Sequence, residues 1–516
     1  MPDLAPDFIA LRLDDVSAAA LARAKTLGSS NASLRIERTH TQLVALRDGV
    51  VQTTADDIEL GVGLRVVRDG AVGFAATAEL EPSSSAGLAD HAVAMARLTA
   101  KAGGRVELAD EPPHGEANWV SEFRIDPTEV PLSEKVGILE QWSRRLLDAG
   151  AVDHVTAHVL AVSEDKYYAD DAGTVVLQRR VRIQPQVEVH AVEDSGGFES
   201  VRTTGPPAGR GWEYLHGEGW DFEREINELP SLLEEKVNAP SVDPGSYDLV
   251  IDPTNLWLTI HESVGHATEL DRALGYEAAY AGTSFATIDK LGKLKYGSEL
   301  MHVTGDRTTP YGLATVGYDD EGVSAQAFDI VRDGVLVGYQ LDRTMARANG
   351  FGRSNGCAYA DSAMHIPIQR MPNVSLQPAK GNGSGPSTAK GARGDASDGP
   401  STQDLISGTD RGIYIVGDKS WSIDMQRYNF QFTGQLFYRI EGGRLAGQVK
   451  DVAYQSSTLD FWGSLDALGG ASTYVLGGAF NCGKGQPAQV APVSHGCPSA
   501  RFRQVNVLNT RAEAGR

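Results

Sequence analysis

Cysteine is scarce in this chain, and acidic residues outnumber basic ones. The 516 residues include only three cysteines, Cys357, Cys482 and Cys497. This low, odd number excludes a disulfide framework and is typical of a reducing compartment such as the cytoplasm. Lysine and arginine total 47 against 68 aspartates and glutamates, so the formal charge is −21. Because binding to phosphate backbones needs clustered cations, this composition argues against direct contact with nucleic acid.

Long apolar runs are also missing. No stretch of about 18 uninterrupted apolar residues occurs, which argues against a membrane-spanning helix. The N-terminus, MPDLAPDFIALRLDD, lacks a basic segment followed by a continuous apolar one, so it does not resemble a secretory signal. We therefore expect a cytoplasmic protein that does not contact a membrane.

Glycine, by contrast, is abundant, with 57 residues that gather at turns between short β-prone runs. Asp-Gly pairs at 48–49, 69–70 and 333–334 each separate two such runs. Both central residues of a type I′ hairpin turn need a positive φ, which Asp-Gly tolerates. In the first half, the pattern predicts strands at 34–46, 64–68, 155–162, 174–181 and 186–192. We expect a sheet-rich α+β fold.

Three segments are predicted to be helices, namely 83–102, 131–150 and 221–239. The first has an apolar face formed by Leu88, Ala92, Met95 and Leu98, which we expect to pack across the sheet. The third is charged and precedes a segment rich in proline, serine and glycine. Such a change predicts a domain boundary near residue 238.

Two domains are therefore expected, an N-terminal α/β domain over 1–238 and a C-terminal β-rich domain over 239–516. Residues 379–402, AKGNGSGPSTAKGARGDASDGPST, contain no large apolar side chain. Such a composition cannot contribute to a core, so it predicts a flexible surface insertion in the second domain.

The segment HESVGH at 261–266 resembles a metalloprotease zinc helix, but its histidines are five residues apart instead of four. At about 100° per residue, an offset of five places His266 about 140° around a regular helix from His261. A π-bulge would return both histidines to one face, and Gly265 would ease such a distortion. A strand at Tyr247–Ile251, followed by Asp252 as N-cap and Pro253 in the first turn, would support this helix. Taken alone, the segment fits two ordinary helix histidines equally well.

A catalytic zinc normally takes three protein ligands, so a third donor is needed. The candidates are Cys482, Cys497, Cys357, His495, Glu269 and Asp271. Cys482 is modestly favoured because it lies in a glycine-flanked loop, where the nearby Lys484 would favour a thiolate. The pair of His495 and Cys497 remains an alternative, since a lone cysteine is more often a small buried apolar residue.

Several segments together resemble the TldD/PmbA family, and specifically its TldD-type metallopeptidase subunit. They are HESVGHATELDR, which follows a strand ending in DP, then RMPNVSL, GIYI with FQFTGQLFYRIEGGRL, and the late NCGKGQ. The resemblance covers residues 246–510 and extends more loosely into the first half, where GRGWEY is similar to a Gly-aromatic-Glu segment of the family. The insertion at 379–402 departs from the family pattern.

The resemblance implies a Zn²⁺ site formed by His261, His266 and Cys482, with Glu262 as the catalytic base. It also implies cleavage of unfolded or flexible peptides in a chamber between the two domains of a dimer. That dimer would be a homodimer or a heterodimer with a metal-free family subunit. The mechanism expected is attack by a metal-activated water whose proton passes through Glu262 to the leaving amine.

Two other classes of function stay open at the level of sequence. The chain could be a non-proteolytic regulatory or partner subunit, in line with the family's older association with DNA gyrase. Retention of all four site residues argues against a partner subunit, and the charge of −21 argues against DNA contact. A cysteine hydrolase using Cys482 and a histidine such as His495 is the other alternative, and a chelator would leave it active.

Overall fold

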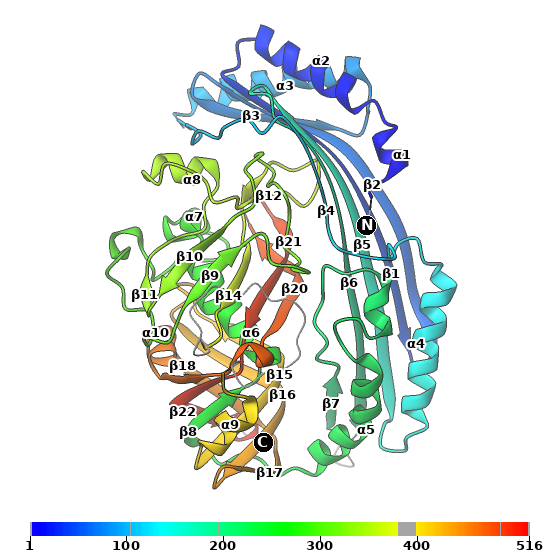
Figure 1. Cartoon of the computed structure of the whole chain (residues 1–516), viewed down its shortest axis with the longest axis vertical. Coiled ribbons are helices and arrows are strands. Elements are labelled where there is room, and N and C mark those ends of the chain that lie inside the picture. The colour runs from blue at the N-terminus through cyan, green and yellow to red at the C-terminus, as the bar shows by residue number, and fades with distance from the viewer. Residues whose placement is uncertain (1–2, 104, 193–196, 380–398, 486, 514–516) are drawn as a thin grey trace.

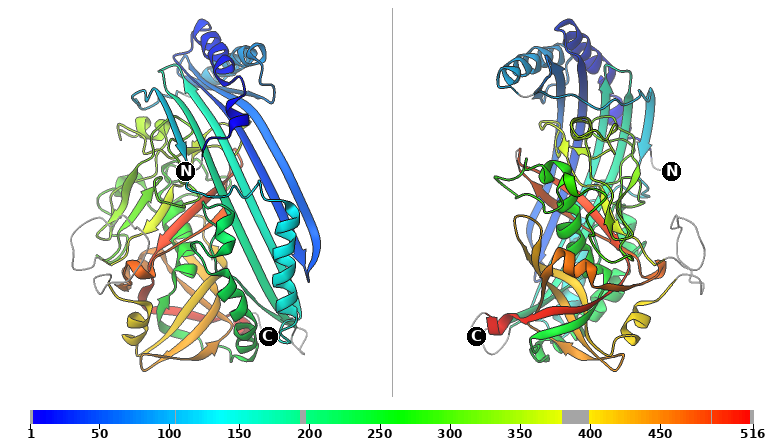
Figure 2. Two further views of the ribbon diagram at one scale, coloured as in Figure 1. Left: turned by 45° about the vertical axis from the view of Figure 1, so that its right-hand side comes forward. Right: turned by 90° about the vertical axis from the view of Figure 1, so that its left-hand side faces the viewer.

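The structure is a computed structural model of the whole chain, and it describes residues 3–103, 105–192, 197–379, 399–485 and 487–513. Its first half is a long, curved sheet that arches along one side of a more compact second half (Figure 1). Two further views show the long strands running past the body of the second half (Figure 2). Sheets dominate both halves, which confirms the sheet-rich α+β fold.

The first sheet has the strand order β3-β2-β1-β5-β6-β4, with β7 beside β6, and only the β4–β6 pair is parallel. Helices α2 and α3 cover its upper end, and α4 and α5 flank its lower end (Figure 1). The elements are α1 Pro6–Ile9, α2 Leu13–Thr26, β1 Asn31–Arg47, β2 Val50–Arg68, β3 Ala71–Thr77, α3 Pro82–Lys101, β4 Glu116–Val120, α4 Leu132–Leu147, β5 His154–Asp170, β6 Val175–Val192, β7 Phe198–Arg202 and α5 Phe222–Asn238.

All three Asp-Gly turns are confirmed. Asp48, Asp69 and Asp333 have φ values of 51°, 53° and 49°, and the glycine after each is also positive. The first two turns join β1 to β2 and β2 to β3, and the third joins two short strands of the second half. Because Asp and Gly tolerate these left-handed backbone conformations, the tight turns of the long hairpins can form.

Two strands are longer than predicted. Strand β2 begins at Val50, although only 64–68 was predicted, because residues 50–59 are largely exposed on both faces and show no apolar alternation. Strand β6 is continuous through Pro185, where the sequence indicated two strands at 174–181 and 186–192. In both cases pairing with β1 or β5 along the ladder overrides the local pattern.

The apolar face predicted for helix α3 is only half right. Leu88 and Ala92 are buried, but residues Met95 and Leu98 are 49% and 58% exposed. The buried face is made mainly of small side chains because the helix approaches β3 very closely. A Cβ at Gly73 of β3 would lie 1.9 Å from the carbonyl oxygen of Ala92. Such an approach leaves no space for larger side chains.

The second half is organised around a sheet with the order β15-β8-β22-β18-β16-β17. Because β15 also pairs with β16, five of these strands close into a ring. Its strands are β8 Gly245–Ile251, β15 Arg411–Ile423, β16 Asn429–Glu441, β17 Arg444–Val449, β18 Val452–Ser457 and β22 Ala500–Asn509, with β19 Leu465–Leu468 beside β22. Its core is rich in aromatic side chains, such as Phe430, Tyr454 and Phe502.

Smaller sheets and helices complete the second half. The strands are β9 Val303–Asp306, β10 Ala327–Arg332, β11 Val335–Leu336, β12 Ala358–Tyr359, β13 Ile368–Gln369, β14 Asn373–Leu376, β20 Val475–Lys484 and β21 Gln489–Cys497. The helices are α6 Pro253–Ile260, α7 Leu270–Ala273, α8 Arg343–Ala348, α9 Thr402–Ser407, α10 Thr458–Gly463 and α11 Thr510–Glu513. Among the described residues, no helix is long and apolar enough to cross a membrane.

Most of the insertion predicted at 379–402 lies outside the described residues. Its two described ends are held side by side, since the backbone N–H of Ala379 donates to Gly469 and that of Gly470 donates to Pro400. Ser401 already forms a capping box with Asp404 at the start of α9. The boundary predicted near residue 238 coincides with the end of α5, and we propose a division of the chain there.

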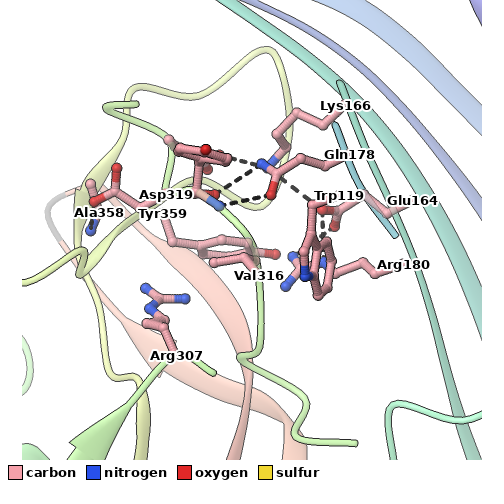
Figure 3. Close-up of a pocket in the computed structure, with 12 residues that line it drawn as sticks. Trp119, Glu164, Lys166, Gln178, Arg180, Arg307, Val316, Asp319, Ala358 and Tyr359 are labelled. Carbon is pink, nitrogen blue, oxygen red and sulfur yellow. Dashed lines mark hydrogen bonds and ion pairs between the residues drawn. The ribbon is translucent and has the colours of Figure 1, made fainter. Parts of the chain in front are cut away.

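A network of buried charges joins the two halves around a small pocket (Figure 3). Lys166 of β5 contacts Asp320 at 2.7 Å, and Arg65 of β2 pairs with Glu321. The side-chain oxygen of Gln178 accepts hydrogen bonds from the backbone N–H groups of Gly317 and Tyr318. The segment 317–321 is thereby fastened to the concave side of the first sheet.

Candidate metal centre

The helix that carries HESVGH is built as its sequence predicts. Asp252 caps α6, accepting a hydrogen bond from the backbone N–H of Thr254 at 3.0 Å, and Pro253 is the first helical residue. Residues His261–Gly265 then form a π-helical turn in which the N–H of His266 donates to the carbonyl of His261. The widened turn brings the two imidazole rings together, with their centroids 4.6 Å apart. The spacing of five is thus accommodated by a π-turn.

Cys482 completes a group of three donors with His261 and His266. The ligand atoms of the three residues all lie within 4.8 Å of one another, and all three side chains are buried. The Cys482 Sγ atom is 3.6 Å from Nε2 of His266. Cys482 lies in strand β20, at a register shift in its pairing with β21, and not in the loop that the sequence indicated.

The other candidate third ligands have different partners. Cys357 contacts the carbonyl of Asn355, and Cys497 contacts that of Pro253. Asp271 pairs with Lys484, while Glu269 and His495 each hydrogen-bond to one of the two histidines. Lys484 is also bound to Glu269. Burial raises the pKa of Cys482, and the cation that opposes this rise is Arg370, contrary to the expectation for Lys484.

Burial decides the protonation of the three donors. It lowers the pKa of His261 and holds that of His266 well below its usual range, so both imidazoles are neutral and carry a free lone pair. Burial also raises the pKa of the Cys482 thiol to about 11. Two neutral imidazoles and a cysteine sulfur form a set of three protein donors, the number that a catalytic zinc ion normally takes. The residues therefore fit the metal.

Each histidine has a partner that orients its ring. Nδ1 of His266 lies 2.8 Å from Oε2 of Glu269, and Glu269 also contacts Arg272 and Lys484. Burial alone would raise the pKa of Glu269, but Lys484 and His266 outweigh it and keep the group ionised. Nδ1 of His261 lies 2.7 Å from Nε2 of His495. In both histidines, Nε2 is left free of these contacts.

Glu262 is held by a residue that the sequence analysis did not find. Nη1 of Arg427 donates to Oε2 of Glu262 at 2.6 Å, and Nη2 donates to the carbonyl of Ala281. Arg427 has a positive φ of 63°, within a turn whose N–H groups are bound by the carboxylate of Asp424. A local signal for the turn existed in Asp424, but nothing in the sequence connected it with Glu262.

These residues open onto a cleft of about 580 Å³ between the two halves. The first half contributes residues of β6, β7 and the segment after it, including Gln184, Arg202 and Thr204. The second half contributes Trp257 and Trp421 together with most of β20. Glu262 and the three donors lie in the wall formed by the second half.

Comparisons with known proteins show what the chain is similar to. Residues 244–509 match the PmbA/TldA metallopeptidase C-terminal domain, and residues 32–96 match domain 1 of the same proteins. A metalloprotease from Methanothermobacter thermautotrophicus is 28% identical, covering 93% of this chain and 95% of its own. A TldD homologue from Haemophilus influenzae, also named a metalloprotease, is 24% identical over 93% of both chains.

The fold is shared with solved structures. TldE from Thermococcus kodakarensis superposes with a TM-score of 0.65 at 15% identity, covering 94% of this chain and 98% of its own. A candidate modulator of DNA gyrase from Thermotoga maritima gives a TM-score of 0.72 at 17% identity, covering 95% and 99%. The match over 244–509 alone spans more than half of the sequence. The chain therefore belongs to the PmbA/TldA metallopeptidase family, as the resemblance to TldD predicts.

Proposed function

We propose that this protein is a zinc-dependent peptidase that cleaves unfolded or flexible peptides. The observation that carries the proposal is the group of His261, His266 and Cys482, which lies beside Glu262 in the wall of a cleft of about 580 Å³. A relative from Saccharolobus solfataricus that is named a zinc metalloprotease TldD homologue supports the choice of metal. It is 22% identical over 56% of this chain and 57% of its own.

In this proposal His261, His266 and Cys482 hold the zinc ion. When bound, zinc supplies Lewis-acid chemistry that polarises the scissile carbonyl and makes water more acidic. Glu262 takes the proton of the attacking water and later delivers it to the leaving amine. Arg427 keeps the Glu262 carboxylate in one orientation, which a general base needs for efficient proton transfer.

Strand β20 is the surface proposed to hold the substrate. It pairs with β21 along one edge, and within the described residues no strand pairs with its other edge. Val475 and residues 477–483 of this strand line the cleft. An extended peptide would add as a further strand through main-chain hydrogen bonds, which give affinity with little choice of sequence. A folded substrate cannot offer such a strand.

We further propose a dimer, either of like chains or with a metal-free subunit of the family, in a reducing cytoplasmic compartment. The resemblance to the TldD/PmbA family, which implies a dimer, supports this proposal, and the chain shares the fold of TldE. All three cysteines are free and buried, which fits a reducing environment. Purifying the chain alone and assaying an unfolded casein would separate a self-sufficient enzyme from one that needs a partner.

Two variants test the proposal directly. Glu262→Gln should retain zinc and lose cleavage of unfolded casein by about 10²–10⁴-fold, because a general base is removed. Cys482→Ala should lose zinc, whereas Cys497→Ala, which changes a buried cysteine outside the donor group, should retain it. Full activity in Glu262→Gln, or unchanged zinc content in Cys482→Ala, would show that the respective role is wrong.

One observation favours a second candidate function, that of a thiol hydrolase. The Cys482 sulfur lies 3.6 Å from Nε2 of His266, which is the geometry of a cysteine and its base, although the sequence pointed to His495 for that role. Burial, however, raises the pKa of the Cys482 thiol to about 11, which disfavours the thiolate that such an enzyme needs. A metal chelator separates the two, since a thiol hydrolase would remain active after zinc is removed.

A further inference from the structure

His495 is a buried histidine that contacts His261 but does not belong to the proposed zinc site. It lies in strand β21, is fully buried, and stacks on Trp257 with a ring-centroid distance of 6.2 Å and an interplanar angle of 9°. Its Nε2 atom is 2.7 Å from Nδ1 of His261, and its Nδ1 atom is 2.9 Å from the carbonyl oxygen of Val374. Both ring nitrogens are therefore engaged.

The direction of these hydrogen bonds follows from the chemistry of their ends. A carbonyl oxygen only accepts, so Nδ1 of His495 carries a hydrogen and donates it to Val374. Neither hydrogen-bond partner of His495 is an acid, so a second hydrogen on this fully buried ring would create a charge without a counter-ion. Nε2 of His495 must then accept, and Nδ1 of His261 must donate.

We propose that His495 is a positioning residue that fixes the tautomer and the orientation of His261. With its hydrogen held on Nδ1, His261 keeps the lone pair of Nε2 for the metal. This inference rests on the proposed function, because it assigns a purpose to that lone pair. The same proposal explains why His495 lies so close to the donor group without being a third ligand. The 2.7 Å between its Nε2 atom and Nδ1 of His261 is the length of a hydrogen bond.

The two histidines are thus oriented by different devices. His266 donates to the carboxylate of Glu269, whereas His261 donates to a neutral imidazole that is itself held by a backbone carbonyl of β14. Partners of this kind raise the affinity of a site for its metal because the ligand needs no reorientation on binding. Strand β14 therefore helps to orient the His261 ring, because its Val374 carbonyl holds His495 and His495 holds His261.

Variants of His495 test the inference. His495→Phe keeps a flat ring against Trp257 and removes the acceptor, and we expect zinc affinity, measured by chelator competition, to fall about 10–100-fold. His495→Gln offers an amide oxygen to His261 and an N–H to Val374, so it should recover most of that affinity. Cys497→Ala, a buried change in the same strand, should bind zinc as the wild type does. The melting temperature of each metal-free protein shows whether a variant is folded.

A second measurement does not depend on zinc binding. In the metal-free wild-type protein labelled with ¹⁵N-histidine, NMR should show His261 with its hydrogen on Nδ1, and His495→Phe should shift it to a mixture of tautomers. Unchanged zinc affinity in His495→Phe, an equal loss in Cys497→Ala, or a wild-type His261 with its hydrogen on Nε2 would overturn the inference. A wild-type protein that binds no zinc would instead overturn the proposed function, and the NMR result would still decide the hydrogen bond.

Discussion

Arg427 and Glu262 form a buried ion pair in the wall of the cleft, with Nη1 of the arginine 2.6 Å from Oε2 of the glutamate. The two residues are 165 positions apart in the sequence. Their side chains are only 12% and 6% exposed, so bulk solvent screens the ion pair little. The carboxylate that we propose as the general base therefore has a fixed orientation.

Arg427→Met should slow peptide cleavage while leaving zinc content unchanged. The methionine fills part of the same space but releases the Glu262 carboxylate, and misplacing a catalytic group by about 1 Å can cost on the order of 10²-fold in rate. We expect kcat on a fluorogenic peptide to fall about 10–100-fold. Arg444→Met, at an exposed position on β17, is the matched control. Wild-type kcat in Arg427→Met would show that the ion pair does not orient the base.

Gly477→Ala should destabilise the protein, whereas Gly483→Ala in the same strand should not. A Cβ at Gly477 would lie 2.5 Å from Cγ of Trp257, but one at Gly483 would meet nothing within 4 Å. Overpacking of this kind costs about 1–3 kcal/mol of unfolding free energy. Trp257 belongs to α6, which leads into the π-turn. Thermal unfolding of the two variants measures the difference. Equal melting temperatures would contradict the close contact between β20 and α6.

The contribution of Asp342 to stability should fall as the pH rises from about 5 to 8, and Asp342→Asn should remove that contribution. Burial, followed by the repulsion of Glu321, raises the pKa of Asp342 from 3.8 to about 8. The unfolded carboxyl ionises near its usual pKa, so between these values the folded state holds an extra proton and loses stability as the pH increases. One such proton changes the free energy of unfolding by about 1.4 kcal/mol per pH unit.

Asparagine suits this test because it can keep the cap that Asp342 forms on α8, where the side chain accepts a hydrogen bond from Met345. Unfolding free energies at several pH values, taken from urea titrations, give the slope for each protein. A variant with the same slope as the wild type would show that Asp342 does not carry the extra proton.

The elements that could be predicted are those whose cause is local. The π-turn followed from the spacing of His261 and His266, and the hairpins followed from Asp-Gly pairs such as Asp48-Gly49. The apolar face of α3 was misassigned at Met95 and Leu98 because the close approach to Gly73 is set by the sheet and not by the helix. The sequence pattern of a helix does not show how near its neighbour lies.

The partners of the site could not be predicted from the residues alone. Cys482 was favoured among six candidates, and only the family resemblance chose it, because its distance to His266 is set by the pairing of β20 with β21. Arg427 contacts Glu262 from 165 positions away, and His495 contacts His261 from 234 positions away. No sequence pattern within a short window relates residues so far apart. Contacts of this kind depend on the packing of whole strands.

The cleft has one wall from each half of the chain, and the buried charges of Lys166, Asp320, Arg65 and Glu321 tie those halves together. It therefore cannot widen freely to admit a folded domain. Under the proposed function, the lifetime of a client protein would follow the fraction of time for which one of its segments is locally unfolded. Two clients with identical cleavage sites would then be degraded at different rates, and the enzyme would report on conformational stability instead of sequence.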